Sequence, residues 1–339
     1  MRPRNDALSK PPSFAIRYLP AVKSFLISAI LLGAIASPAL AQSPPSGRPL
    51  NPMSASRSGL SYEPYLPYDL SRNRWSAAFE YGNAIERDER GSASYLLDAE
   101  LMRTSIGWTR DLSPRLWLSL QGEVVGSYAG FADGFFVWYH RQIGFVQPER
   151  NARPKNSYGF ELTLPDGTHL APERTPFALG DARATIGFRH DFFQQSTLSI
   201  TLPTATGHGQ LGRGVPSVSA THTLRIDLAD PLFWEISAGA GFTPKHGVLR
   251  DYQRSLFAMG TTGVRIHLWG GQSIYGYFFY HTPYYHNTTL ASLDSRELTG
   301  DFGWMIHSSG GNEWRIGMTE DLKPGDNGID LVFKVSGSW

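Results

Sequence analysis

The alternation of apolar and polar residues is the feature that most constrains how this chain can fold. It is plainest in the last ten residues, DLVFKVSGSW, where Leu331, Phe333, Val335 and Trp339 fall on one face. A period of two residues is the side-chain period of a β-strand with one buried face. Carboxyl termini are usually frayed and polar, so a strand that runs to the final residue indicates that this end pairs with another part of the chain.

The same alternation recurs throughout residues 73–339, and the connections between the segments differ in length. Short turns include 111–114 and 270–272, whereas the long connections are 84–93, 129–177, 207–215, 243–255, 283–295 and 320–327. Short turns at one end and long loops at the other are typical of transmembrane β-barrels. A β-sandwich also alternates its strand faces, but it has no reason to gather its long loops at one end.

The number of strands follows from one hairpin signal. Counting every strand-like segment gives an odd number, which single-chain bacterial barrels avoid. Segment 157–173 contains Asp166-Gly167, a hairpin signal, inside the longest loop. If this hairpin stands outside the wall, twelve strands remain and both chain ends lie on the same side. We therefore predict an all-β fold, an antiparallel up-and-down transmembrane barrel whose long extracellular or lumenal loop 129–177 holds a short helix and this hairpin.

The amino-terminal region predicts export. Residues 1–23 are basic, residues 25–36 are apolar, and Ala39-Leu40-Ala41 is a small-x-small cleavage site. This order is that of a secretory signal peptide, and the apolar run is shorter than the ~20 residues of a spanning helix. We expect a cleaved signal peptide at 1–41, a periplasmic tether at 42–72 and the barrel at 73–339, located in a Gram-negative outer membrane.

Composition excludes several classes of function. Residues 1–41 hold five of the 31 basic residues and one of the 30 acidic residues, so the remaining chain has a net charge of −3. Nothing basic enough remains to predict a nucleic-acid partner. The chain has no cysteine, which rules out a disulfide framework and a cysteine-based metal site. We expect no cofactor and no metal.

The polar faces of the predicted strands carry charges of both signs in similar number. These lumen candidates are Glu80, Arg103, Glu123, Asp181, Arg183, Arg189, Arg225, Asp227, Glu235, Arg265, Asp301, Glu313 and Arg315. They are compatible with a salt-bridged, nearly closed interior and with a narrow polar pore of little charge selectivity. Barrels of about eight strands are filled by side chains and those of sixteen or more leave a channel, so twelve strands do not decide between the two.

The stretch 133–156, DGFFVWYHRQIGFVQPERNARPKN, is too apolar for a solvated loop tip. It predicts a short helix with an aromatic face, followed by a basic tail. Two interpretations remain open: a loop packed onto the barrel mouth, and a constriction or ligand site. The candidate residues are Asp133, Phe135, Phe136, Trp138, His140, Arg141, Arg150 and Arg153.

Three short motifs carry a resemblance to a known family. They are Asn51-Pro52, Asp133-Gly134 followed by His140, and the strand-like Leu202-Pro203-Thr204. The chain resembles a proteobacterial family of uncharacterised exported proteins, a domain of unknown function, over most of residues 50–339. The resemblance implies an outer-membrane barrel without an established activity. The "LPT" strand also resembles one in aromatic-compound uptake barrels.

The carboxyl terminus resembles the signal by which the barrel assembly machinery recognises outer-membrane barrels. The residues that match this signal are Phe333, Val335 and Trp339. Trp339 replaces the more usual Phe, and Gly337 stands where an apolar residue is common. The other expected partners are outer-membrane lipid, lipopolysaccharide and a small solute that the sequence does not name.

An enzyme activity is not expected. Outer-membrane lipases and deacylases use a His-x-Ser pair in the barrel wall, and the corresponding spacing here, His307-Ser308-Ser309, falls at a predicted periplasmic turn. We predict a channel or uptake pore for small solutes. The alternative is a non-conducting structural or surface-binding barrel whose lumen is closed by its own ion pairs.

Overall fold

The structure is a computed structural model that describes residues 48–58, 65–66, 73–142, 153–207, 209–229, 232–308, 312–322 and 331–339. The predicted signal peptide at 1–41 lies outside the described residues, and so does Arg150. The side chain of Asp227 is also outside the described part of the chain.

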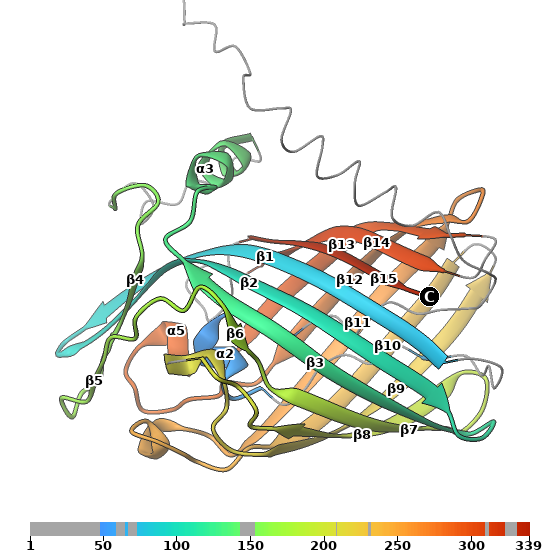
Figure 1. Cartoon of the computed structure of the whole chain (residues 1–339), viewed down its shortest axis with the longest axis horizontal. Helices are drawn as coiled ribbons and strands as arrows, with labels where there is room; N and C mark the ends of the chain where they lie inside the picture. The colour runs from blue at the N-terminus through green and yellow to red at the C-terminus, as the bar shows by residue number, and fades with distance from the viewer. Residues whose placement is uncertain are drawn as a thin grey trace, which may run out of the picture. The chain divides into compact units, whose positions relative to one another are not determined.

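Twelve antiparallel strands close into a barrel (Figure 1), as the strand count predicted. The wall consists of β1 (Asn73–Arg90), β2 (Ala93–Asp111), β3 (Leu116–Tyr128), β7 (Ala182–Arg189), β8 (Gln194–Leu202), β9 (Ser217–Ala229), β10 (Leu232–Phe242), β11 (Leu256–His267), β12 (Gln272–His281), β13 (Glu297–His307), β14 (Glu313–Asp321) and β15 (Leu331–Ser338). β15 pairs with β1, and the backbones of Trp75 and Trp339 exchange N–H···O bonds of 2.8 and 2.9 Å. The carboxyl-terminal strand therefore closes the barrel. Closure leaves no strand edge whose backbone N–H and C=O groups would lack hydrogen-bond partners in lipid.

Three further strands lie outside the closed wall. β4 (Gly159–Thr163) pairs with the part of β2 beyond its contact with β3, β5 (His169–Leu170) pairs with β4, and β6 (Ala178–Leu179) pairs with β3. The β4–β5 turn contains Gly167 at a φ of +86°, a conformation that favours glycine. The hairpin predicted from Asp166-Gly167 is thus present and stands outside the wall, as expected.

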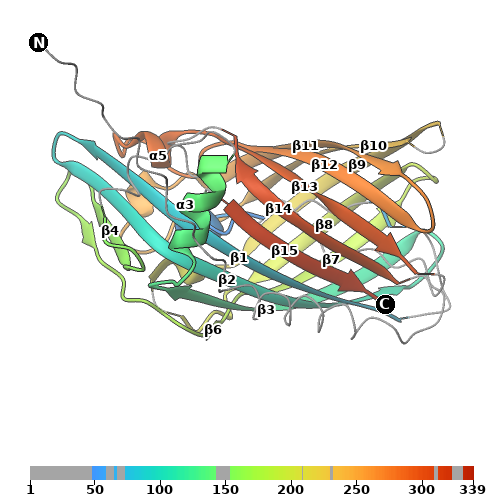
Figure 2. The same ribbon diagram turned by 90° about the horizontal axis from the view of Figure 1, so that it is seen from above.

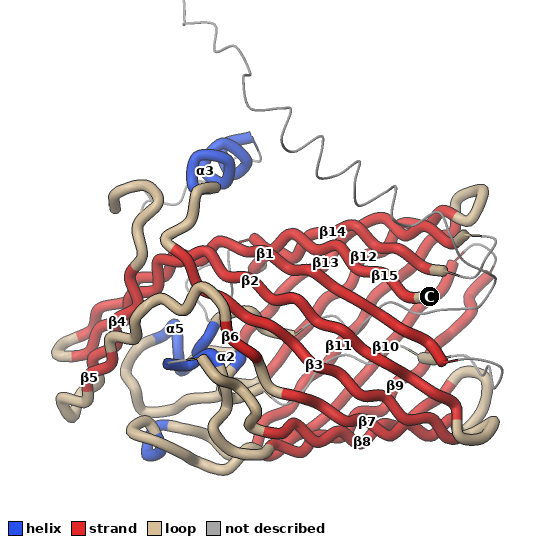
Figure 3. Tube along the Cα trace, viewed as in Figure 1, coloured by secondary structure: helices blue, strands red, loops and turns tan. Residues whose placement is uncertain are grey.

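Helices are few and short (Figure 3). Those within the described residues are α2 (Pro52–Ala55), α3 (Asp133–Gln142), α5 (Ala291–Asp294) and the 3-10 turns η1 (Gly209–Leu211) and η2 (Arg250–Tyr252). None of the helices within the described residues is long and apolar enough to cross a membrane.

The two ends of the barrel differ in the length of their connections. The short-turn end holds residues 112–115, 190–193 and 268–271 between strands, together with the start of β1 and the end of β15. The opposite, long-loop end holds 129–181, 203–216, 243–255 and 282–296. The long connection predicted at 84–93 is wrong, because β1 and β2 pair as far as Arg90 and Ala93 and leave a two-residue turn at this end. Most of the connection predicted at 320–327 lies outside the described residues. In Figure 1 the long-loop end is at the left and the short-turn end at the right.

The outer wall is an exposed apolar surface. Its exposed apolar side chains include Ile106, Leu120, Ile186, Leu198, Ile200, Val218, Val264, Phe278 and Ile316, and aromatic residues such as Trp75, Trp269 and Trp339 are exposed at the short-turn end. A wide exposed apolar band flanked by aromatic residues is the surface that a membrane-spanning barrel presents to lipid. The alternation in the sequence therefore separates lipid-facing from lumenal residues.

Leu198 provides a test of this facing. Its side chain is 56% exposed on the outer wall of β8. We expect Leu198→Arg to lower the free energy of unfolding in phospholipid vesicles by roughly 2–4 kcal/mol, the cost of arginine near the bilayer midplane. Val248→Arg, at a 64% exposed loop position, is the matched control and should change stability by less than about 0.5 kcal/mol. Equal urea midpoints for the two variants would mean that Leu198 does not face lipid.

Candidate lumenal site

The interior of the barrel is lined by the predicted charged residues. The cross-strand register places Glu80 opposite both Arg103 and Lys334, and it places Glu235 opposite Arg225. Most lumen candidates whose side chains are described are buried, and Asp181 lies in the connection just before β7 and not in a wall strand. Buried charges require partners, so the contacts of these side chains decide how the lumen is organised.

One ion-pair network crosses the seam where the barrel closes. Arg103 donates from Nε to Glu80, Lys334 Nζ lies 3.6 Å from Glu80, and Lys334 donates to Asp301 Oδ2 at 2.9 Å. These four side chains come from β2, β1, β15 and β13. The network thus ties the carboxyl-terminal strand to strands on both sides of it.

A second group lies toward the short-turn end. Glu313 pairs with Arg315 at 2.9 Å and with His307 at 2.9 Å. His307 is therefore bound to a lumenal carboxylate, and Ser308 accepts a hydrogen bond from the Asn312 backbone within the turn. Tyr277 donates to Glu235, also on the lumenal side.

The remaining arginines of the wall have diverse partners. Arg225 lies 4.5 Å above the ring of Phe233, Arg183 donates to Ser199 at 3.0 Å, and Arg189 donates to Asp111 at 2.6 Å. Between them runs a stripe of short hydroxyl side chains on β7 to β11, which are Thr185, Thr197, Ser199, Thr201, Ser219, Thr221, Thr223, Ser237 and Thr261. Short side chains along one wall leave more of the barrel radius to whatever occupies the lumen.

An amino-terminal segment, residues 48–58, occupies the lumen at the long-loop end (Figures 1 and 3). Its contacts come from widely separated parts of the wall: Glu86 on β1, Glu123 on β3 and Tyr285 after β12. The expectation of a periplasmic tether over 42–72 needs correction for this part, because residues 48–58 are packed inside the barrel. Their buried polar groups find partners there that an extended tether would lack.

The segment turns inside the lumen through α2. Asn51 is the N-cap, its side chain accepts from the Met53 backbone at 2.9 Å, and Pro52 occupies the first helical position. Asn51 Nδ2 also donates to Glu86 at 2.7 Å. Met53 is fully buried among apolar side chains of the wall and loops, which include Ala84, Tyr95, Leu97, Tyr285 and Leu290. Apolar packing and capping both hold this turn.

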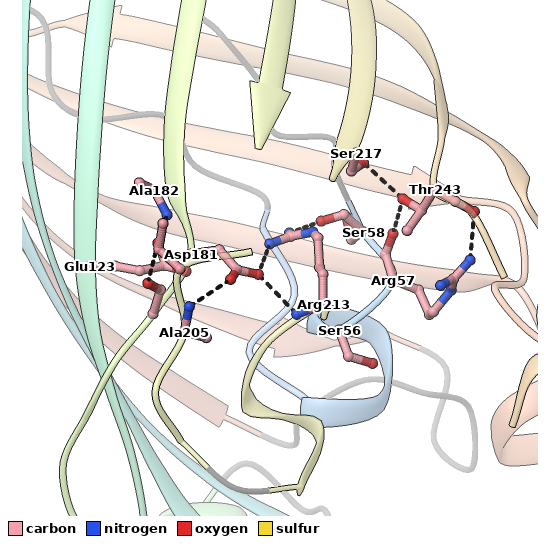
Figure 4. Close-up of polar contacts among 12 residues, drawn as sticks. Ser56, Arg57, Ser58, Glu123, Asp181, Ala182, Ala205, Arg213, Ser217 and Thr243 are labelled. Atoms are coloured by element: carbon pink, nitrogen blue, oxygen red, sulfur yellow. Dashed lines mark hydrogen bonds and ion pairs between the residues drawn. The ribbon is translucent and has the colours of Figure 1, made fainter. Parts of the chain in front are cut away.

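Arg57 is the anchor of the segment (Figure 4). It is 1% exposed and donates to the carbonyl oxygens of Pro244 at 2.8 Å, Thr243 at 2.7 Å and Arg254 at 3.2 Å. Figure 4 shows the bond to Thr243. The Thr243 hydroxyl in turn donates to the Arg57 carbonyl at 2.9 Å. Among the described residues no carboxylate pairs with this guanidinium, and burial lowers the pKa of Arg57.

Arg213 is a second anchor beside Arg57 (Figure 4). It donates to Asp181 Oδ2 at 2.9 Å and to the carbonyl of Ser58, while the Asp181 carboxylate also accepts from the backbone of Ala205 at 3.1 Å. The loop after β8 is thereby joined to the segment and to the start of β7. Burial lowers the pKa of Arg213.

Arg48 and Arg103 complete the attachment. Arg48 forms an ion pair with Glu123 at 2.8 Å, and Arg103 donates to the carbonyls of Pro49 at 3.0 Å and Arg48 at 3.1 Å. A void bounded by the segment, Arg103, Glu123 and Arg213 measures only about 30 Å³. That is room for one or two water molecules, so the segment fits closely here.

Residues 65–66 mark a second contact of the amino-terminal region, at the short-turn end. Leu66 accepts from Arg189 Nε and donates to Gln195 at 2.9 Å, and the Tyr65 hydroxyl donates to Asp191 at 2.9 Å. The described parts of the amino-terminal region therefore contact the lumenal side at both ends of the barrel.

The predicted loop helix lies elsewhere. Figures 1 and 2 both show α3 outside the ring of strands. Phe135 and Phe136 lie 5.6 and 6.0 Å, ring to ring, from Phe333 on the outer face of β15, and His140 contacts Glu320 at 3.4 Å. The helix was correctly expected, but its aromatic face packs on the outer wall. Residues 133–142 therefore do not form a constriction of the lumen.

Most residues that hold the segment were not singled out from the sequence. Arg48 and Arg57 stand in a Pro/Ser-rich stretch whose composition predicts a tether, and Arg213 stands in a glycine-rich loop. One signal was available: Asn followed by Pro is a helix start, and Asn51-Pro52 begins α2.

Comparison with known proteins agrees with the fold. Residues 60–169, about a third of the chain, match the model of a family described as "Protein of unknown function (DUF3187)". The match confirms the resemblance to an uncharacterised domain family that the sequence motifs indicated. No curated protein matches the chain significantly in sequence.

Solved outer-membrane barrels resemble the structure. The COG4313 outer membrane channel from Pseudomonas putida F1 is 11% identical at a TM-score of 0.52, over 81% of this chain and 98% of that one. The NanC porin is 9% identical at a TM-score of 0.44, over 79% of this chain and 99% of that one. The P. putida toluene transporter TodX is 9% identical at 0.43, over 88% and 95%. At these identities the likeness concerns the fold alone, which is that of an outer-membrane barrel.

Proposed function

We propose that the protein is an outer-membrane channel for small polar solutes whose lumen is closed, in the state described, by residues 48–58. The observation that carries this proposal is the way the segment is held. Arg57, Arg213 and Arg48 attach it through side-chain hydrogen bonds and ion pairs with loops and wall. It is a separate occupant of the lumen, joined to the wall by contacts that can be broken without opening a strand pair.

The lining favours small polar solutes of either charge. Charges of both signs lie on the lumenal face, and a stripe of serine and threonine hydroxyls runs along β7 to β11. Hydroxyls can donate and accept hydrogen bonds, so they can replace part of a solute's hydration without selecting its charge. Apolar solutes would find no continuous apolar lining on this stripe.

A second candidate is supported by a different observation. The networks around Glu80 and Glu313 belong to the wall itself and would remain if the segment left. A lumen narrowed by these pairs would make the protein a non-conducting structural or surface-binding barrel. The two candidates differ in what happens when the segment is removed.

The test is single-channel conductance in planar bilayers. Residues 48–58 are replaced by a Gly/Ser segment of equal length, which keeps the chain length but removes the side chains that dock. We expect conductance to rise at least severalfold, because the long-loop end of the lumen loses its occupant. An inserted, heat-modifiable barrel with unchanged conductance would instead support the non-conducting alternative.

Helix α3 supplies the matched control. Replacing Phe135 and Trp138 by serine changes exposed aromatic residues on the outer wall. Because these side chains lie outside the lumen, conductance should stay at the level of the unmodified protein. A rise equal to that of the segment replacement would mean that conductance reports general loosening of the barrel.

Location and assembly partners follow from the same proposal. The fold shared with outer-membrane barrels supports an outer-membrane location, with the long-loop end at the cell surface. Trp339 stacks on Trp314 at 6.4 Å, and its backbone pairs with Trp75. We infer that Phe333, Val335 and Trp339 serve recognition by the assembly machinery, since all three lie on the lipid face of the closing strand.

A further inference from the structure

A pocket on the outside of the barrel is unrelated to the lumen. It lies between α3 and residues 153–155 and has a volume of about 370 Å³. Its lining includes Trp138, Arg141, Arg153, Lys155, Asp98 and Asp133. The volume is in the range of small-ligand sites.

The charges of this pocket are not balanced. Asp98 is bound by Arg153 and by the Ser157 hydroxyl, and Asp133 accepts from Asn83 at 2.9 Å and from the Asn156 backbone at 2.6 Å. Asp98 is therefore neutralised by Arg153, whereas Asp133 is hydrogen-bonded to neutral groups and keeps its negative charge. Arg141 and Lys155 are exposed and have no ion-pair partner among the described residues. With three basic side chains against two carboxylates, the lining of the pocket has a net charge of +1.

The pocket adjoins the lipid-facing wall. Trp138 lines it and is 54% exposed, and Phe135, one turn earlier, is 45% exposed while it packs on Phe333. Exposed aromatic residues beside basic residues are typical of a helix at the boundary between lipid tails and headgroups. A ligand here would meet apolar surface on one side and cations on the other.

We propose that this pocket binds the phosphate group of an outer-leaflet lipid. Arg141 and Lys155 would pair with the phosphate oxygens, since guanidinium and ammonium groups form charge-assisted hydrogen bonds with phosphate. The acyl chains would lie against Phe135 and Trp138. The proposal commits to a phosphorylated lipid because a soluble anion would gain nothing from the exposed aromatic residues. It does not depend on whether the lumen conducts.

The test uses the full barrel refolded in detergent and three probes: a bisphosphorylated lipid A, the same lipid without phosphates, and inorganic phosphate. Binding is measured by native mass spectrometry and by the shift of the thermal unfolding midpoint. Arg141→Gln combined with Lys155→Gln removes two charges at the pocket. Lys245→Gln combined with Arg250→Gln removes two exposed charges elsewhere at the long-loop end and is the control.

We expect the phosphorylated lipid to bind the unmodified protein and the control equally, and the pocket variant about tenfold or more weakly. The lipid without phosphates should bind weakly to all three proteins. Equal binding of the phosphorylated lipid to the pocket variant and the control would overturn the site. An equal midpoint shift with inorganic phosphate would overturn the lipid assignment in favour of a soluble anion.

Discussion

Arg103→Gln should lower the free energy of unfolding by about 3–5 kcal/mol, the usual cost of removing one partner from a buried ion pair. Arg103 is buried and pairs with Glu80 next to the seam formed by β15 and β1. In the variant Glu80 would still have Lys334 at 3.6 Å. That ammonium group is already bound to Asp301 at 2.9 Å, so it would not replace the lost partner. The variant also loses the donors to the carbonyls of Arg48 and Pro49.

The control for this prediction is an exposed pair on the same hairpin. Arg87 pairs with Glu89 at 2.9 Å, and the two side chains are 50% and 61% exposed. Arg87→Gln should cost less than about 1 kcal/mol, because exposed pairs contribute little. Urea unfolding of both variants in vesicles measures the difference. Similar free energies of unfolding for the two variants would show that the Glu80 network is solvated and does not stabilise the barrel.

The barrel could be predicted from the sequence because its determinants are local. Period-two alternation assigns residues to lipid or lumen, and turn length assigns most connections to an end. The two-residue turn between β1 and β2 is the exception, since these strands stay paired as far as Arg90 and Ala93. The pairing of the last strand with the first then follows from closure, since an unpaired edge is not tolerated in lipid. The hairpin at Asp166-Gly167 can also be predicted from the sequence, because a two-residue turn signal depends on local residues alone.

The occupant of the lumen could not be predicted in the same way. Residues 48–58 show no alternation, and a Pro/Ser-rich composition is also that of a linker. Their position depends on partners far along the chain: Arg57 reaches Thr243, 186 residues later, and the Tyr285 hydroxyl reaches Met53, 232 residues away. No local pattern encodes such contacts.

The placement of α3 illustrates a different limit. Its aromatic residues predict a helix with one apolar face, but an apolar face can pack into a lumen or onto a lipid-facing wall. The choice is made by Phe333 and Met318 on the outside of β15 and β14, which contact Phe135, Phe136 and Tyr139. Composition alone does not distinguish the two surfaces, since both are apolar.

Arg57→Met should release the lumenal segment without removing it. Methionine keeps the unbranched apolar stem and avoids the cost of burying a charge, but it is shorter than arginine and leaves three carbonyl oxygens, those of Thr243, Pro244 and Arg254, without their donors. An orphaned buried acceptor costs roughly 1–3 kcal/mol. A net loss of about 3 kcal/mol would raise the ratio of undocked to docked segment by about two orders of magnitude. We therefore expect a matching rise in open probability in planar bilayers.

Two further variants distinguish the hydrogen bonds of the Arg57 guanidinium from its positive charge. Arg57→Lys keeps a positive charge and hydrogen-bond donors but loses the planar fork that reaches Thr243 and Pro244 together, so its open probability should be intermediate. Arg250→Met removes a 71% exposed guanidinium whose ion-pair partner, Asp251, is exposed as well, and it should leave open probability nearly unchanged. If Arg57→Met stays as closed as the unmodified protein while the replacement of 48–58 conducts, the apolar contacts of Met53 hold the segment in place of Arg57. The anchor would then lie at α2, where Met53 is fully buried.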